Sequence, residues 1–141
     1  MHGAGDTVGR GLAPATIFEG EAEMALVIGR TVRRVSGDEA LAAVAGYTVA
    51  NDVTMRDYQY KTHQWLVGKT WASSTPLGPY LVTPDEVGDP HALDISLTLN
   101  GETMQSSNTS RFIFDIPTLI ATISEFIPLN PGDVILTGTP E

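Results

Sequence analysis

The sequence predicts a single domain of the α+β class that is mainly β. Several short segments have strand-like patterns and are separated by turns rich in glycine and proline, whereas only a few segments have helical periodicity. Strands and helices do not alternate regularly, which argues against a parallel α/β sheet. A chain of 141 residues is long enough for one hydrophobic core and little more.

The composition is that of an ordinary globular protein, with 42% apolar and 18% charged residues. A formal charge of −9 repels phosphate backbones, so we expect no nucleic-acid binding. No apolar run approaches the roughly 18 residues that span a bilayer, and no export pattern is visible. We therefore expect no membrane association and a cytoplasmic location. The absence of cysteine excludes thiolate catalysis and cysteine-based zinc sites.

The N-terminal third is predicted to contain a loop, a strand and a helix. Residues 1–18 are rich in glycine and are expected to form a loop or an edge segment. Residues 18–29 alternate and then become continuously apolar, which is typical of a strand that enters a core. Ser36 and Glu39 have the spacing of a capping box, which predicts a short helix that Gly46 ends.

The central part is predicted as strand, helix and loop. Residues 47–50 are a predicted strand. Thr54 and Asp57 have the spacing of a second capping box, which predicts a helix over 55–65. Residues 72–84 are predicted to form a loop followed by a strand.

The C-terminal third carries the clearest local signals. Residues 94–105 alternate in hydrophobicity around an Asn-Gly dipeptide, which strongly indicates a β-hairpin. A proline at the first position favours an amphipathic helix over 117–127. Residues 134–140 are predicted as the last strand, after an Asn-Pro-Gly-Asp turn.

Closely spaced acidic residues are candidates for a metal site. Glu19, Glu21 and Glu23 are two positions apart in a predicted strand, so their carboxylates point to one face. A solvated strand edge is the commoner explanation of such spacing. Asp52, however, follows another apolar strand that could lie beside them. Three oxygen ligands suit Mg²⁺, Mn²⁺ or Ca²⁺ better than Zn²⁺.

Further polar residues are candidates for substrate contacts. In the predicted helix, Arg56, Gln59 and His63 lie on one face. Arg56 could bind a carboxylate through two hydrogen bonds and Gln59 could bind a carbonyl, although an exposed helix face explains the pattern equally well. Lys69 lies between two tryptophans, where a surface lysine is the commoner case. The turn at 137–140 could bring backbone N–H groups close to a ligand.

Six blocks of sequence occur in order between Glu19 and Glu141: EAEMALVIG, VAGYTVANDVTMRDYQ, GKTW, STPLGPYLVTPDE, LNGETMQ and LNPGDVILTGTPE. Together they resemble the fumarylacetoacetate hydrolase family, above all its acylpyruvate hydrolases and 2-hydroxyhepta-2,4-diene-1,7-dioate isomerases. The resemblance implies that residues 19–141 form an incomplete catalytic domain. The implied fold is the family's mixed β-sandwich roll with a few short helices, apparently truncated at both ends. It also implies a homodimer.

The resemblance implies roles for individual residues as well. Glu21, Glu23 and Asp52 are implied to hold a divalent metal, Mg²⁺ or Mn²⁺, with Ca²⁺ as a further candidate. Lys69 is the implied active-site lysine. The implied substrate contacts are Arg56, Gln59, Gly138 and Thr139.

The implied activity is metal-dependent hydrolysis of a C–C bond in acylpyruvate-type 2-oxo acids, in aromatic compound catabolism. The alternative is an isomerase or decarboxylase acting on related enol dicarboxylates, because all these reactions pass through an enolate. In the family, a histidine and a glutamate upstream of the metal ligands activate the water, and residues 1–18 contain no match. An inactive fragment that serves as a binding subunit therefore stays open, as does a structural protein stapled by a metal.

Overall fold

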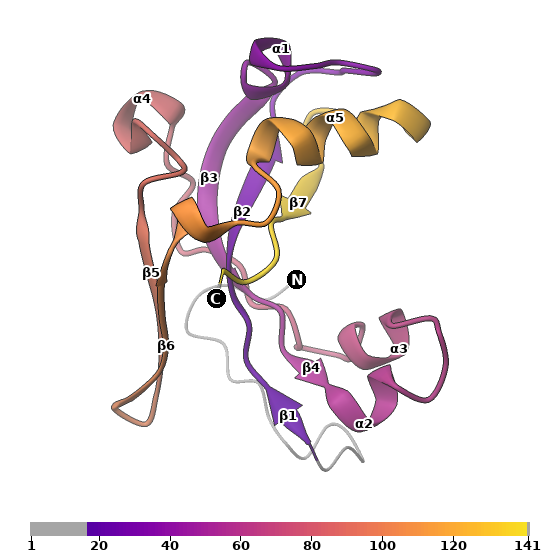
Figure 1. The fold of residues 1–141 in the computed structure, drawn as a ribbon, viewed down its shortest axis with the longest axis vertical. Helices are drawn as coiled ribbons and strands as arrows, with labels where there is room; N and C mark the ends of the chain where they lie inside the picture. The colour runs from indigo at the N-terminus through magenta and orange to yellow at the C-terminus, as the bar shows by residue number, and fades with distance from the viewer. Residues whose placement is uncertain (1–16, 141) are drawn as a thin grey trace.

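The computed structural model describes residues 17–140, and its centre is a three-stranded antiparallel sheet in the order β3-β2-β7 (Figure 1). The strands are β2 (Ala22–Ile28), β3 (Val44–Asn51) and β7 (Val134–Leu136). Strand β2 pairs with β3 along its whole length and with β7 over Ala25–Val27, and six of its seven residues are buried.

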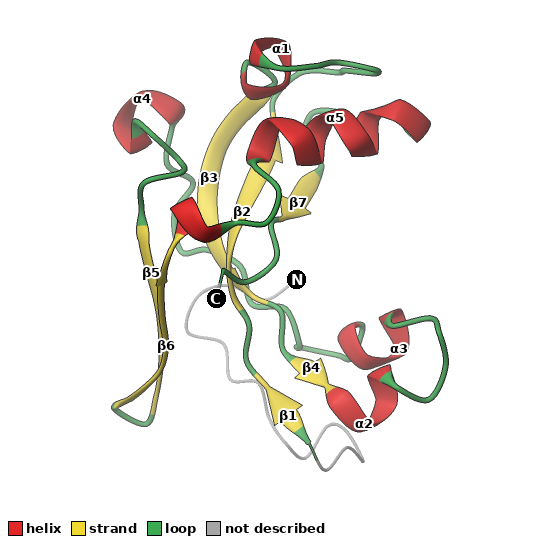
Figure 2. Cartoon of the chain, in the orientation of Figure 1, coloured by secondary structure: helices red, strands yellow, loops and turns green. Residues whose placement is uncertain are grey.

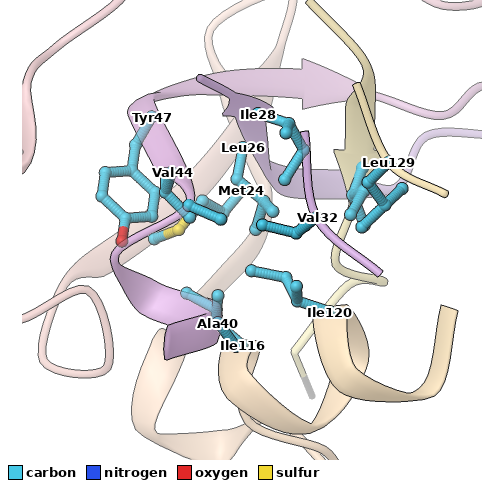
Figure 3. Close-up of a cluster of buried hydrophobic side chains, with 12 residues drawn as sticks. Met24, Leu26, Ile28, Val32, Ala40, Val44, Tyr47, Ile116, Ile120 and Leu129 are labelled. Atoms are coloured by element: carbon cyan, nitrogen blue, oxygen red, sulfur yellow. The ribbon is translucent and has the colours of Figure 1, made fainter. Parts of the chain in front are cut away.

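One face of this sheet packs against helix α5 (Ile116–Phe126). Met24 and Leu26 of β2 lie opposite Ile116 and Ile120 of the helix, and these side chains form the centre of the hydrophobic core (Figure 3). Alternate residues of a strand face opposite sides of the sheet. Glu23, which alternates with these residues along β2, therefore points away from this core.

A second group of elements lies at one end of the sheet, in the lower part of Figure 1. Strand β1 (Phe18–Glu19) pairs with β4 (Thr54–Met55) in antiparallel register. The one-turn helices α2 (Arg56–Gln59) and α3 (Leu66–Lys69) follow β4 and pack against each other. This end of the molecule carries the residues of the candidate site.

The hairpin of β5 (Asp94–Leu99) and β6 (Glu102–Asn108) lies beside the sheet, and a short 3-10 helix (Thr109–Arg111) follows it (Figure 2). Asn100 and Gly101 have φ angles of 52° and 86°, as a two-residue hairpin turn requires. The predicted hairpin is confirmed.

The predicted C-terminal helix is also confirmed, with its boundaries shifted by one residue. It begins after Asp115, whose side chain accepts a hydrogen bond from the N–H of Thr118 at 2.8 Å. This cap explains why the helix begins one residue before the proline that marked it in the sequence.

The predicted short helix after Ser36 is present, but its N-cap and its end differ from the prediction. Helix α1 covers only Asp38–Leu41, with Gly37 at its N-cap and no side-chain cap bond. Strand β3 already begins at Val44, so Gly46 lies inside a strand instead of ending a helix. A Cβ atom at Gly46 would lie 2.7 Å from the carbonyl oxygen of Val82, so close backbone approach, not helix termination, requires this glycine.

The prediction of a helix over 55–65 is largely wrong, because Thr54 lies in a strand and the helix after it is short. Thr54 lies in β4 opposite Glu19, and its hydroxyl donates to the carbonyl of Asp52 at 3.0 Å. The helix that follows covers only Arg56–Gln59, so His63 is not on its face. Pairing with β1 holds Thr54 in an extended conformation, which overrides the local capping pattern.

Other boundaries differ less. The predicted strand at 18–29 is present but divided between β1 and β2, and the predicted last strand at 134–140 is limited to the three residues of β7. The predicted strand within 72–84 is reduced to isolated bridges that join Leu77 and Val82 to β3. Helix α4 (Pro84–Val87) was not predicted.

Residues 1–16 of the predicted N-terminal loop lie outside the described residues, and the proposed boundary between 18 and 19 stays a prediction. Within residues 17–140, no helix is long and apolar enough to cross a membrane.

Candidate active site

Three carboxylates meet where two paired strands end. Glu21 and Glu23 lie at the start of β2, and Asp52 directly follows β3. Each of the three offers an oxygen within 4.8 Å of the others. The backbone fixes this approach, because the N–H of Asp52 donates to the carbonyl of Glu21 at 3.0 Å and Ala22 pairs with Asn51. The three residues predicted as metal ligands are therefore brought together.

Lys69 binds two of these carboxylates. Its Nζ atom donates to Glu21 Oε2 at 2.8 Å, to Asp52 Oδ2 at 2.5 Å and to Thr54 Oγ1 at 2.9 Å. Burial alone would lower the pKa of Lys69, but the hydrogen bonds to Asp52 and Glu21 outweigh it and raise the pKa above its usual value. The lysine is therefore a cation at neutral pH.

Close packing of two short helices places Lys69 in this position. Gly68 crosses α2 so closely that an added Cβ atom would lie 2.7 Å from Gln59 Cβ and 2.9 Å from the Gln59 backbone. Only glycine permits this approach without displacing one helix. The last residue of α3 thus reaches the carboxylates.

Arg56 is held by three protein acceptors. Its Nε atom donates to Glu19 at 2.5 Å, Nη1 donates to Gln59 Oε1 at 2.8 Å and Nη2 donates to Glu21 Oε1 at 2.6 Å. The hydrogen bond to Glu19 raises the pKa of Arg56 and lowers that of Glu19. Gln59 is 2% exposed. The two predicted substrate contacts therefore bind each other in this structure, and the guanidinium also orients Glu21.

Glu23 differs from the other two carboxylates because it accepts from a backbone group. Its side chain is buried, and Oε2 accepts a hydrogen bond from the N–H of Gly138 at 2.7 Å. Burial raises the pKa of Glu23 to about 7, against the effect of the Gly138 bond, and the nearby charges of Asp52 and Glu21 add to the rise. Among the described residues, no cationic side chain forms an ion pair with Glu23.

The C-terminal turn completes the site. Gly138 has a φ of 80°, which turns the chain away from β7 and aims its N–H at Glu23. Thr139 lies next to it, and its hydroxyl accepts a hydrogen bond from Gln105 of β6 at 3.3 Å. Gly138 therefore contacts a carboxylate directly, whereas Thr139 is linked through Gln105 to the backbone between Glu21 and Glu23.

Sequence reasoning missed the roles of Thr54 and Gln105. Thr54 was assigned to a helix cap, whereas it accepts a hydrogen bond from Lys69. Gln105 closes one of the matching sequence blocks, but nothing in its spacing connects it with Ala22, whose N–H it accepts across 83 positions at 2.8 Å. Such a contact is a property of the tertiary structure alone.

Residues 1–141 match the family described as Fumarylacetoacetate (FAA) hydrolase C-terminal. The chain belongs to the fumarylacetoacetate hydrolase family. It is 51% identical over 121 residues to the mitochondrial oxaloacetate tautomerase Fahd2a of Rattus norvegicus, a match that covers 85% of this chain and 39% of that protein. It is also 51% identical over 121 residues to a 2,4-didehydro-3-deoxy-L-rhamnonate hydrolase of Sphingomonas sp. (strain SKA58), covering 85% of this chain and 42% of the relative.

A solved structure supports the fold of this family member. The 5-carboxymethyl-2-hydroxymuconate delta-isomerase from Mycobacterium smegmatis superimposes with a TM-score of 0.86 at 42% identity, and the match covers 92% of this chain and 50% of that one. The predicted mainly β fold of the family is thereby confirmed. This chain spans half the length or less of these three proteins. The relatives are enzymes, and their names describe a tautomerase, a hydrolase and an isomerase.

Proposed function

We propose that this chain carries a divalent-metal centre at which small 2-oxo acids are converted between keto and enol forms. The observation that carries the proposal is the convergence of Glu21, Glu23 and Asp52 within 4.8 Å, beside the protonated Lys69. An all-oxygen donor set favours Mg²⁺ or Mn²⁺, with Ca²⁺ as the alternative.

The charge balance of the site supports metal binding. Glu21 is bound by both Arg56 and Lys69, and Asp52 is bound by Lys69. Within the described part of the chain, the negative charge of Glu23 is stabilised by the N–H dipole of Gly138 and not by an ion pair with a cationic side chain. Ionising all three carboxylates together therefore costs free energy in the buried site, and a bound dication would remove that cost.

A divalent ion bound there would act as a Lewis acid that stabilises an enolate. Lys69 would contribute a fixed positive charge beside the reacting group, since its raised pKa keeps it protonated and its three N–H groups donate to Glu21, Asp52 and Thr54. The hydroxyl of Thr139 would bind the carboxylate of the substrate, and a substrate group that reached the N–H of Gly138 would replace Glu23 as its acceptor. Because Arg56 and Gln59 are already paired, a substrate group that reached them would replace a protein acceptor.

We favour tautomerisation or isomerisation because these reactions need stabilisation of an enolate charge, which the proposed metal and the Lys69 cation would supply. The names of two similar proteins, an oxaloacetate tautomerase and a muconate isomerase, describe such reactions. The second candidate is hydrolysis of the C–C bond of an acylpyruvate, which is favoured by the similarity to a hydrolase. Decarboxylation of the same substrate class also stays a prediction, as do the homodimer and the cytoplasmic location.

Metal binding is the first test. Isothermal titration calorimetry with Mn²⁺ and Mg²⁺ should show saturable binding that Asp52→Asn and Glu23→Gln each weaken by at least tenfold, because each removes one charged oxygen ligand. Glu125→Gln, an equal change in charge at an exposed position of α5, is the matched control. Binding that is unaffected by the first two substitutions would contradict the metal centre.

Turnover is the second test. With Mg²⁺ present, ketonisation of enol-oxaloacetate is followed by ultraviolet absorbance, and cleavage of an acylpyruvate is followed by release of pyruvate. Lys69→Met should lower kcat by roughly 10²-fold or more, whereas Lys61→Met, at an exposed position over the ring of Tyr58, should leave it unchanged. If the parent chain neither binds a metal nor turns over any of these substrates, the result would favour the hypothesis of an inactive binding subunit.

A further inference from the structure

Gln105 joins three segments that are far apart in the sequence. Its side chain is half-buried in β6. Oε1 accepts from the N–H of Ala22 at 2.8 Å, and Nε2 donates to the hydroxyl of Thr139 at 3.3 Å. Ala22 lies between two of the proposed metal ligands, and Thr139 is a proposed substrate contact. One amide thus touches both sides of the candidate site.

The hydrogen bond to Ala22 compensates for a missing strand. The N–H of Thr137 donates to the carbonyl of Met24 at 3.0 Å, so the even-numbered residues of β2 direct their backbone groups toward β7. The chain leaves β2 at the Gly138 turn, before it could pair with Ala22. Because Ala22 is buried, an unpaired N–H there would be costly. Gln105 supplies the missing acceptor.

The hydrogen bond from Ala22 also fixes the direction of the hydrogen bond between Gln105 and Thr139. A backbone N–H can only donate, so the atom of Gln105 that faces Ala22 must be the carbonyl oxygen. The NH₂ group then faces Thr139 and can only donate to its hydroxyl oxygen. Within the described residues, no protein acceptor takes the Thr139 proton. The hydroxyl therefore still has a proton to donate, and an anion such as a carboxylate can accept it.

We propose that Gln105 is a positioning residue that presents the Thr139 hydroxyl as a hydrogen-bond donor to the carboxylate of a small 2-oxo acid. The same amide anchors the β5–β6 hairpin to the strand that carries the metal ligands. The proposal rests on the proposed function for the identity of the ligand, whereas the anchoring rests on geometry alone.

The anchoring is tested without substrate or metal, by hydrogen exchange of backbone amides observed by NMR. Gln105→Met removes the acceptor and should accelerate exchange of the Ala22 amide by at least tenfold. Gln105→Glu keeps an oxygen acceptor and should preserve its protection. Thr103→Val, at an exposed position two residues earlier in β6, is the control. Unchanged protection of Ala22 in Gln105→Met would overturn the proposal.

The positioning is tested by a double-mutant cycle on the Mg²⁺-loaded chain, with KM for oxaloacetate and the dissociation constant of pyruvate as readouts. Gln105→Met and Thr139→Val should each raise both constants by about tenfold, with kcat changed less than threefold. Thr139→Ser, which keeps the hydroxyl, should raise both constants less than Thr139→Val does. The double variant should be no weaker than either single variant, because the glutamine acts through the hydroxyl.

Effects that multiply in the double variant would overturn the positioning role. A parent chain that binds Mg²⁺ but neither pyruvate nor oxaloacetate would overturn the role of Thr139 together with the proposed function. A parent chain that turns over substrate, with Gln105→Met at the parental KM, would overturn only the inference about Gln105. The two failures are therefore distinguishable.

Discussion

Glu23 is a carboxylate placed where ionisation is costly. It is 3% exposed, and its one hydrogen bond from the backbone does not offset the loss of hydration, so its pKa rises to about 7. A position of this kind is tolerated when the group is protonated or when a cation binds it. The residue therefore links the pH of the solution both to the stability of the metal-free protein and to the proposed binding of a metal.

We predict that the metal-free protein loses stability as the pH rises through neutrality. The folded pKa of Glu23 is about 7 and its reference value is 4.5, so the folded state holds a proton that the unfolded state has released between these values. The contribution is complete below pH 4.5 and lost above pH 7, and it amounts to about 3 kcal/mol. Urea denaturation with a chelator, at pH 5 and pH 8, measures it.

Glu23→Gln provides the control, because its amide oxygen can still accept from Gly138 but does not titrate. The free energy of unfolding of Glu23→Gln, relative to that of the parent, should therefore increase from pH 5 to pH 8. An equal pH dependence in both proteins would show that Glu23 is ionised in the metal-free fold.

The site residues themselves were partly predictable at this scale. The spacing of Glu21 and Glu23 placed two carboxylates on one face of a strand, and the structure keeps them together with Asp52. The roles of Lys69 and Thr139 came from the resemblance to a family, since no local pattern connects them with the carboxylates. Gln105 had no signal beyond its membership of a matching block.

At the scale of elements, the contact between α2 and α3 positions Lys69 beside the carboxylates. Helices of one turn have little intrinsic stability, so their arrangement depends on packing. Gly68 is the point of contact, since its missing side chain leaves room for the backbone of Gln59.

We predict that Gly68→Ala destabilises the protein, although alanine favours helices by about 1 kcal/mol. The added Cβ would meet the backbone of Gln59 at 2.9 Å, so one helix must move, at a cost of roughly 1–3 kcal/mol. Urea denaturation measures the loss, and two-dimensional NMR should show shifted signals for Lys69. Val67→Ala, at an exposed position of the same helix, should change stability by less than about 0.5 kcal/mol. A variant of parental stability and spectrum would contradict the prediction.

The elements also show where local patterns succeed. The hairpin was predictable because Asn100 and Gly101 tolerate the positive φ angles that the turn requires. The two capping boxes failed for different reasons. Thr54 pairs in β4 and accepts a hydrogen bond from Lys69, whereas helix α1 begins one residue later than the pattern places it, with Gly37 at its N-cap.

At the scale of the whole molecule, stability depends on one core between the sheet and α5. We predict that Ile120→Ala costs 2–5 kcal/mol, because the side chain is 0% exposed at the centre of this core. That is a large part of the roughly 5–15 kcal/mol that stabilises a typical domain. Thermal and urea denaturation both measure it.

Ile113→Ala is the matched control, since Ile113 is 91% exposed and should contribute less than about 0.5 kcal/mol. Equal losses in the two variants would show that the surface around Ile113 is covered in solution. Sedimentation velocity of the parent chain would then test the homodimer, which stays a prediction from the resemblance.

The sequence by itself determined the class of the fold, the hairpin and helix α5. It also determined that Glu21 and Glu23 share one face of a strand. These features depend on periodicity and on the conformations that single residues allow. The sequence also identified the family through ordered blocks. Only the tertiary structure decided that Arg56 binds Glu21, that Thr54 accepts a hydrogen bond from Lys69 and that Gln105 accepts one from the N–H of Ala22. These contacts join residues 15 to 83 positions apart, and local sequence carries no information on which distant partner a polar group will meet.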